Sequence, residues 1–104
     1  MTAYEVYLAM VKENGDNLYS VPDKFRTPEV CLAAAKESDA AFLYMSEAQR
    51  TPEIYLAMVR KKGWNLCFVP EKLRTPKICL EAISQDPGTI VWSPWSILEL
   101  LALA

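Results

Sequence analysis

Apolar and polar positions repeat along this chain with a period of 24 residues. Written in rows of that length, the chain gives four consecutive units, residues 3–26, 27–50, 51–74 and 75–98, with no insertion between them. One column of the alignment holds Leu8, Leu32, Leu56 and Leu80, and another holds Val6, Val30, Ile54 and Ile78. Such self-similarity is typical of repeat proteins, in which each unit packs against its neighbours. We therefore expect every row to occupy an equivalent structural position.

The first half of each row predicts the longer helix. In the third row, Thr51 offers a side-chain oxygen to the open N–H groups of the first turn, and Pro52 supplies a preset φ where no N–H is needed. Residues 54–59 are apolar throughout, so this helix should be covered on several sides. Cations at residues 60–62 follow beside the last carbonyls, and we expect Gly63 to end the helix in the left-handed conformation.

The second half of each row has two interpretations. Residues 65–69 are compatible with a short strand, whereas Pro70 holds the residue before it extended and is able to open a helical turn. We favour a short helix or 3₁₀ turn over residues 64–74. The expected fold class is all-α: a short helical-repeat solenoid of four units, each with one longer helix and one short helix or 3₁₀ turn. No second domain fits, so residues 1–104 should form a single domain.

The last residues differ in kind from the repeat. Ser93 and Pro94 again place a capping residue before a proline, and residues 97–104 are mostly apolar with Glu99 as their only charge. We expect an apolar capping helix over about residues 93–104 that folds back over the fourth row. The alternative is that this segment leaves an apolar surface for a second copy or for a partner.

Two motifs carry a resemblance to a known family. They are TPE-[VI]-x-L-A-x-[VA], as in TPEIYLA at residues 51–57, and NL-x-x-VP-[DE]-K-[FL]-R, as in NLCFVPEKLR at residues 65–74, and the resemblance covers nearly the whole chain, from residue 3 to about residue 97. Together they resemble an uncharacterised bacterial family of tandem 24-residue helical repeats, classed only as a domain of unknown function. The resemblance implies an α-helical stack with no assigned activity, and the chain departs from the pattern at Asp39, Ser46 and Gln49. The architecture also resembles the leucine-rich-repeat variant, an α/3₁₀ solenoid, in its period and not in its motifs.

The residue types argue against several chemistries. The chain has no histidine, which excludes Ser-His and Cys-His nucleophile pairs and most zinc sites. Cys31 and Cys79 share a column inside the apolar helix, so we interpret both as inert core residues, and Cys67 as packing. Acidic residues are spread singly along the rows, and the glycines are too scattered for a phosphate loop. We expect no enzyme activity, no cofactor and no metal.

The net charge and the cysteine count limit the kinds of partner and the cellular compartment that we expect. The net charge of −2 provides no field that would gather nucleic acid or an anionic membrane, and no apolar run approaches the length of a membrane span. An odd number of cysteines and the lack of a basic-then-apolar leader at residues 1–19 suggest a reduced, cytoplasmic setting. Arg26, Arg50 and Arg74 share a column, in which each is expected near a short helix end or a neighbouring glutamate.

The most cationic stretch, residues 60–77, surrounds a tryptophan. Trp64 is not required by the repeat, because the other rows carry Asp16, Ala40 and Gly88 in its column. Tryptophan beside cations is a typical composition for an interface anchor, although Trp64 would equally serve to cover the tail near Trp92. The candidate interaction surface comprises Trp64, Arg60, Lys61, Lys62, Lys72, Arg74, Lys77 and Trp95.

These observations predict an interaction module or scaffold that binds another protein through the solenoid surface. The alternative is a structural or regulatory homo-oligomer assembled through the apolar C-terminal segment. A nucleic-acid binder would need the basic residues between 60 and 77 to outweigh the overall acidity, and we expect neither nucleic acid nor membrane as a partner.

Overall fold

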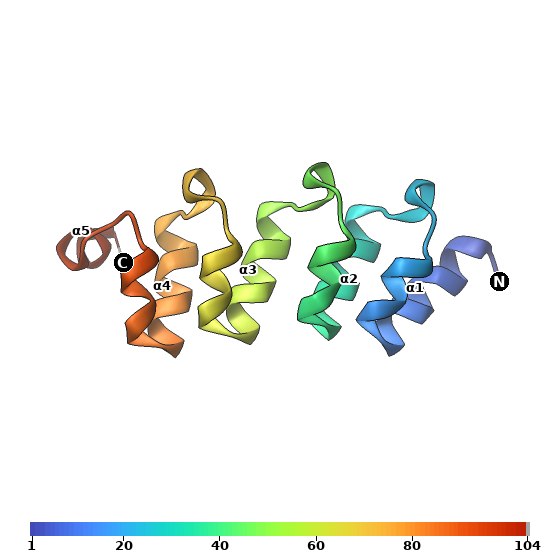
Figure 1. Ribbon diagram of the computed structural model, residues 1–104, viewed down its shortest axis with the longest axis horizontal. Coiled ribbons are helices and arrows are strands. Elements are labelled where there is room, and N and C mark those ends of the chain that lie inside the picture. Colours follow the sequence, from blue (N-terminus) through green and yellow to red (C-terminus); the bar gives the residue numbers. More distant parts are fainter. Residues whose placement is uncertain (104) are drawn as a thin grey trace. The chain divides into compact units, whose positions relative to one another are not determined.

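The computed structural model describes residues 1–103 (Figure 1), and this part of the chain contains helices and no strand. The all-α prediction is confirmed. The α-helices are α1 (Ala3–Glu13), α2 (Pro28–Glu37), α3 (Pro52–Lys61), α4 (Pro76–Gln85) and α5 (Ile97–Leu103). By contacts the chain divides into two compact units, Met1–Ala57 and a second that begins at Met58, so the boundary falls inside α3. The expectation of a single domain over residues 1–104 stays a prediction.

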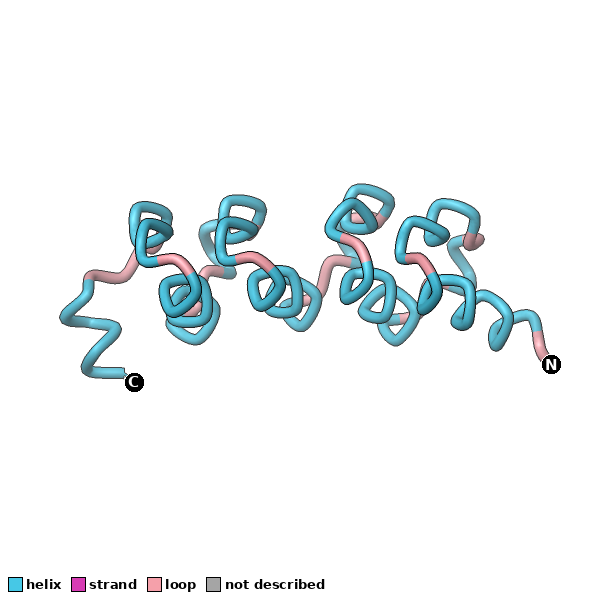
Figure 2. Tube along the Cα trace, turned by 90° about the horizontal axis from the view of Figure 1, so that it is seen from below, coloured by secondary structure: helices cyan, strands magenta, loops and turns pink. Residues whose placement is uncertain are grey.

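The second half of the rows is built from 3₁₀ helices, which confirms the helical interpretation over the strand. In the first unit these are η1 (Gly15–Ser20), η2 (Asp23–Phe25), η3 (Asp39–Tyr44) and η4 (Glu47–Gln49), and in the second η5 (Gly63–Phe68), η6 (Glu71–Leu73) and η7 (Pro87–Trp92). Figure 2 shows the short loops that join them. Row three therefore has two short helices where one was predicted, because Val69 is extended at φ −78° and ψ 125° ahead of Pro70.

The Thr-Pro pairs start the longer helices as predicted. The Thr27 hydroxyl accepts the N–H of Val30 at 3.3 Å, and that of Thr75 accepts the N–H of Ile78 at 3.3 Å. Thr51 accepts the N–H of Ile54 at 3.4 Å in the same way. Each bond satisfies a first-turn N–H that has no partner inside the helix.

The predicted left-handed end at Gly63 is wrong, because no glycine of the described chain has a positive φ. The Met58 carbonyl at the end of α3 instead accepts the Lys62 N–H at 3.1 Å and the Asn65 side-chain amide at 2.8 Å. Gly63 is needed for close approach: a Cβ there would lie 2.7 Å from the Ala82 carbonyl oxygen. The glycine thus lets η5 pack directly on α4.

Each unit has its own apolar core between its α-helices and its 3₁₀ helices. In the first unit Val11, Leu18, Val30, Ala34 and Ala35 are fully buried, and in the second Val59, Leu66, Cys79 and Ala82 are. The column of Val30, Ile54 and Ile78 is buried as expected. Val6, in the same column, is 41% exposed, because the contacts of α1 with α2 and η1 cover its other face around Val11.

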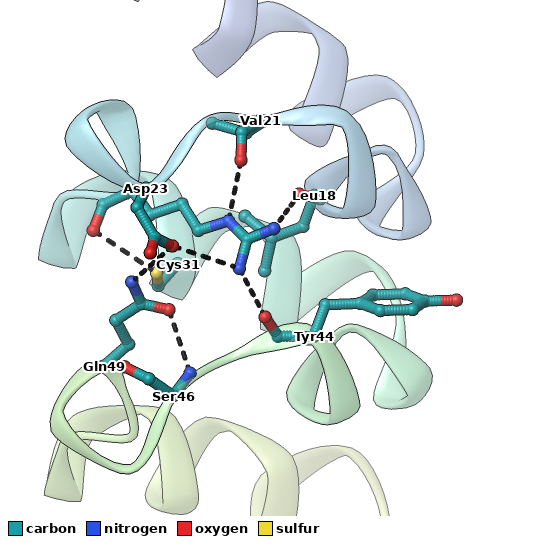
Figure 3. Close-up of polar contacts among 8 residues, drawn as sticks. Leu18, Val21, Asp23, Cys31, Tyr44, Ser46 and Gln49 are labelled. Atoms are coloured by element: carbon teal, nitrogen blue, oxygen red, sulfur yellow. Dashed lines mark hydrogen bonds and ion pairs between the residues drawn. The ribbon is translucent and has the colours of Figure 1, made fainter.

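The Arg26 side chain links η1 to η3 within the first unit. Its guanidinium donates through Nε to the Val21 carbonyl at 2.8 Å, through Nη2 to that of Leu18 at 3.1 Å and through Nη1 to that of Tyr44 at 2.5 Å. Figure 3 shows these three carbonyls converging on one guanidinium. One side chain therefore satisfies carbonyls at the C-terminal ends of η1 and η3, which belong to two consecutive rows.

In the second unit, Arg74 stands in the column of Arg26 and also donates to backbone carbonyls. The Arg74 Nε donates to the Val69 carbonyl at 2.9 Å and Nη1 to the Trp92 carbonyl at 2.7 Å. These arginines thus lie at short helix ends, as the sequence suggests. Arg50 also contacts a ring, since its guanidinium carbon lies 3.9 Å from the centre of Phe42.

The C-terminal helix begins later than predicted. It starts at Ile97 because Ser96 caps it: Glu99 accepts the Ser96 N–H at 3.0 Å, and Ser96 accepts the Glu99 N–H at 3.1 Å. Residue 104 of the predicted helix lies outside the described residues. The helix contacts α4 and buries Leu100, and its other leucines, Leu98, Leu101 and Leu103, are exposed. That this segment caps row four stays a prediction.

Candidate functional site

Trp64 packs against the 3₁₀ helix of row four. It is 41% exposed, its indole N–H donates to the Asp86 carboxylate, and its ring meets that of Trp92 edge-to-face with centroids 4.8 Å apart. A Cβ at Gly88 would lie 3.3 Å from the Trp64 ring. These contacts fit the alternative in which Trp64 covers Trp92. Part of the Trp64 side chain remains open to solvent.

The cations around Trp64 lie on exposed positions. Lys61 is the last residue of α3 and Lys62 follows it, and Arg60 places its Nε 3.4 Å from the Glu81 carboxylate on α4. The Arg60 carbonyl also accepts the Gln85 side-chain amide at 2.8 Å. Lys72 on η6 and Lys77 on α4 are exposed as well. An exposed ion pair such as that of Arg60 with Glu81 contributes little to stability.

Arg74 and Trp95 hold the backbone of the second unit together. The Arg74 guanidinium is bound by carbonyls, and its own carbonyl accepts the Trp95 indole N–H at 2.9 Å. The Ser93 hydroxyl accepts the Trp95 N–H at 3.0 Å and fixes the bend before α5. The predicted surface thus divides into Trp64 with Trp92, Arg74 with Trp95, and the exposed lysines with Arg60.

An open groove on α4, which sequence reasoning missed, lies beside two of these cations. It has a volume of about 680 Å³, and its lining consists of Pro76, Lys77, Leu80, Glu81, Ser84 and Leu103. Pro76 and Leu80 supply apolar lining, Lys77 and Glu81 supply charged lining, and α5 contributes Leu103. Arg60 reaches this wall through its ion pair with Glu81. We call this surface the α4 groove.

The first unit has an open groove on the equivalent columns. Its volume is about 420 Å³, and its lining consists of Lys12, Glu29, Leu32, Ala33, Lys36 and Glu37. Leu32 stands in the column of Leu80, and Glu29 in that of Lys77. We call this surface the α2 groove. The signal in the sequence is the leucine column itself: the apolar run predicts a covered helix face, whereas Leu32 and Leu80 are only half-buried.

The charged residues that line the α2 groove differ in their hydrogen-bond and ion-pair partners. Glu29 accepts a hydrogen bond from the Tyr4 hydroxyl at 2.5 Å, and this hydrogen bond raises the pKa of Tyr4. Within residues 1–103, neither Lys12 nor Lys36 forms an ion pair with a carboxylate. Glu37, which also lines the groove, forms no ion pair within these residues either, so the groove presents unpaired charges of both signs beside Leu32 and Ala33.

The thiols differ in access, which gives a testable prediction. Cys31 and Cys79 are buried, each donates to an arginine carbonyl at 3.7 Å, and burial raises the pKa of both thiols, whereas Cys67 is exposed. Because the thiolate is the reactive form, we expect maleimide to modify one thiol of the native chain rapidly and the other two only after denaturation. Mass spectrometry over time checks this, and Cys67→Ser should remove the fast step. Two fast thiols would contradict it.

Residues 1–103 contain neither a cluster of metal ligands nor a helix that could span a membrane. No three side chains among cysteine and the carboxylates of this part of the chain gather closely enough to hold a metal ion. None of its helices combines the length and the apolar character needed to cross a bilayer.

Comparisons with known proteins place the family resemblance on rows three and four. Searches of curated proteins and of solved structures found no match. One family model matches over residues 51–98, which are rows three and four, and its description is a domain of unknown function. The resemblance inferred from the TPE and VPEK motifs is confirmed over these rows. Residues 51–98 of this chain therefore match the uncharacterised family DUF4116, the domain of unknown function.

Proposed function

We propose that this chain is a protein-binding module that receives apolar side chains of a partner helix in its α2 and α4 grooves. One observation carries the proposal: the same columns of the repeat form an open groove with a leucine in its lining in each unit. Apolar area of the groove that is removed from water favours binding. The charged lining residues set the orientation of the partner.

A helix is a better fit to these grooves than a small molecule. Both grooves are open and are lined mainly by residues of one helix, which matches the binding of an amphipathic helix through spaced anchors. The α4 groove already has a leucine on its edge, Leu103 of the chain's own α5. In this proposal Lys77 and Arg60, two residues of the predicted cationic surface, contact acidic side chains of the partner.

Binding without catalysis is part of the same proposal. It is supported by the absence of histidine from the sequence and by the burial of two of the three thiols. The unpaired cysteines favour a reducing compartment, the cytoplasm, for this activity.

A second candidate is a homo-oligomer assembled through the C-terminal segment. The observation in its favour is the exposure on α5 of Ile97 at 51%, Leu98 at 78%, Leu101 at 66% and Leu103 at 58%. Four exposed apolar side chains on one short helix form the kind of patch that a second protein surface covers.

Selection of displayed peptides tests the groove proposal. A library of peptides patterned as amphipathic helices should yield binders of the full chain, and Leu32→Glu with Leu80→Glu should weaken them by about tenfold or more, because a charge in the groove lining cannot be buried unpaired. Leu43→Glu is the matched control, since Leu43 is 67% exposed on η3 outside both grooves. Circular dichroism verifies the fold of each variant. The proposal fails when no peptide is enriched, or when enriched peptides bind the double variant as well as the wild type.

A further inference from the structure

A small cavity lies beside the first turn of α2, within the first unit. Its volume is about 90 Å³, and its lining consists of Arg26, Pro28, Cys31, Ala48, Gln49 and Thr51. None of these residues lines the α2 groove, and all of them belong to the unit Met1–Ala57. Figure 3 shows Cys31 and Gln49 of this lining. We call it the Arg26 cavity.

The second unit repeats half of this lining. The columns of the repeat that hold Arg26, Pro28 and Cys31 in the first unit hold Arg74, Pro76 and Cys79 in the second. In each unit the backbone carbonyl of the arginine accepts the thiol of the cysteine at 3.7 Å. The two carbonyls therefore have the same neighbour, one at the start of α2 and the other at the start of α4.

An indole ring uses the Arg74 carbonyl as a second donor. The Trp95 indole N–H donates to this oxygen at 2.9 Å, in addition to the Cys79 thiol. A carbonyl oxygen has two lone pairs and accepts both. The first unit has no such donor in its own chain, because residues 1–57 contain no tryptophan and Glu47 stands in the column of Trp95. The first unit instead has a cavity beside the equivalent carbonyl.

We propose that the Arg26 cavity binds an indole ring, whose N–H donates to the Arg26 carbonyl as the Trp95 N–H donates to the Arg74 carbonyl. Two sources supply this chemistry: a small molecule that contains indole, and the tryptophan side chain of a partner protein. The inference does not depend on the α2 and α4 grooves, because the cavity shares no residue with either.

The other polar groups of the lining already have partners. The Arg26 guanidinium donates to three carbonyls, so it is not free to hold an anion. The Gln49 side chain donates to Asp23 at 3.5 Å and accepts the Ser46 N–H at 3.0 Å. The Thr51 hydroxyl accepts a first-turn N–H of α3 at 3.4 Å. The Arg26 carbonyl is therefore the acceptor that the cavity offers to a ligand.

The shape and polarity of the remaining lining fit part of an aromatic ring. Pro28, Cys31 and Ala48 supply apolar lining, which matches a flat apolar ring that carries one N–H donor. A cavity of about 150 Å³ holds a whole benzene ring, so the smaller Arg26 cavity takes the N–H edge of an indole and leaves the remainder outside. Trp95 is itself only half-buried. We expect free indole to bind weakly, with a Kd of about 1 mM.

Titration of the full isotope-labelled chain with free indole, followed by NMR, tests the inference. We expect saturable shifts of the backbone amide signals of Cys31 and Gln49, which line the cavity. Benzofuran has the shape of indole without the N–H, so it should bind about fivefold more weakly through the loss of one hydrogen bond. N-acetyltryptophanamide distinguishes the sources: binding as tight as that of indole identifies a tryptophan side chain, and binding of indole alone identifies a small molecule.

Two variants of the full chain locate the site. Ala48→Leu adds volume to the lining, and Glu47→Trp places an indole of the chain itself in the column of Trp95. We expect the variant that fills the cavity to bind free indole about tenfold more weakly or not at all. Ala40→Leu is the matched control and should bind as the wild type, because Ala40 is an exposed alanine of η3 outside the lining. Circular dichroism verifies the fold of each variant.

Three results would overturn the inference. They are the absence of saturable shifts up to about 10 mM indole, ten times the expected Kd, equal binding of benzofuran and indole, and unchanged binding of indole in both Ala48→Leu and Glu47→Trp. None of these results affects the groove proposal, which is decided by the peptide selection.

Discussion

Replacing Gly15 with alanine is expected to lower the free energy of unfolding by about 3 kcal/mol, the upper part of the range for overpacking. A Cβ at this position would lie 2.3 Å from the Ala34 carbonyl oxygen and 2.8 Å from the Ser38 Cβ. The first of these atoms belongs to the backbone of α2, so relief of the clash requires η1 to move away from α2. That movement would open the buried contacts of Leu18. Urea denaturation followed by circular dichroism measures the change.

Gly88→Ala is the matched control for Gly15→Ala. Its nearest neighbours would be ring atoms of Trp64, at 3.3 and 3.4 Å, and a carboxylate oxygen of Asp86. These are atoms of side chains, one of which is partly exposed, so we expect a change below about 1 kcal/mol. Equal effects of the two substitutions would contradict close backbone approach as the reason for Gly15, because φ is not positive at either glycine.

Replacing Arg26 with methionine should cost about 3 kcal/mol, since it leaves the carbonyls of Leu18, Val21 and Tyr44 without their charged donor. Methionine keeps much of the apolar stem, so the change isolates the loss of the guanidinium. Arg26→Lys should recover only part of the stability, because one ammonium group cannot reach three carbonyls with the geometry of a planar fork. The midpoint and slope of chemical denaturation measure both variants.

Lys24→Met controls for the loss of a positive charge in the same short helix. Lys24 is exposed, and its ammonium lies 5.2 Å from the centre of the Phe25 ring, an interaction worth about 0.5–1 kcal/mol at an exposed site. The effect of Lys24→Met should therefore stay below about 1 kcal/mol. Similar losses for Arg26→Met and Lys24→Met would mean that net charge, and not the carbonyl contacts, determines the role of Arg26.

Contacts between nearby residues explain which predictions succeeded. The hydroxyl of Thr75 caps a helix through an N–H three residues away, and Val69 is extended because a proline follows it. Both effects act within a few bonds along the chain, so the residue types alone predict them. The period of 24 then places the same start and the same break in successive rows, which predicted an all-α repeat.

The candidate surface was predicted only as a composition. Tryptophan and lysines between residues 60 and 77 are visible in the sequence, but their partners are not. Trp64 contacts Asp86, 22 residues away, and Arg74 donates to the Trp92 carbonyl, 18 residues away. Such pairings depend on how consecutive rows pack, and no local pattern encodes them.

The sequence by itself thus determined the repeat, the helix starts and the absence of histidine chemistry, since these follow from residue types and short-range sterics. Tertiary structure alone decided that Gly63 serves close packing, that Arg74 binds carbonyls, and that Leu32 and Leu80 line open grooves. The reason is that burial is a property of neighbouring segments: a leucine in an apolar column is core or surface according to what packs over it, which the chain decides only when it is folded.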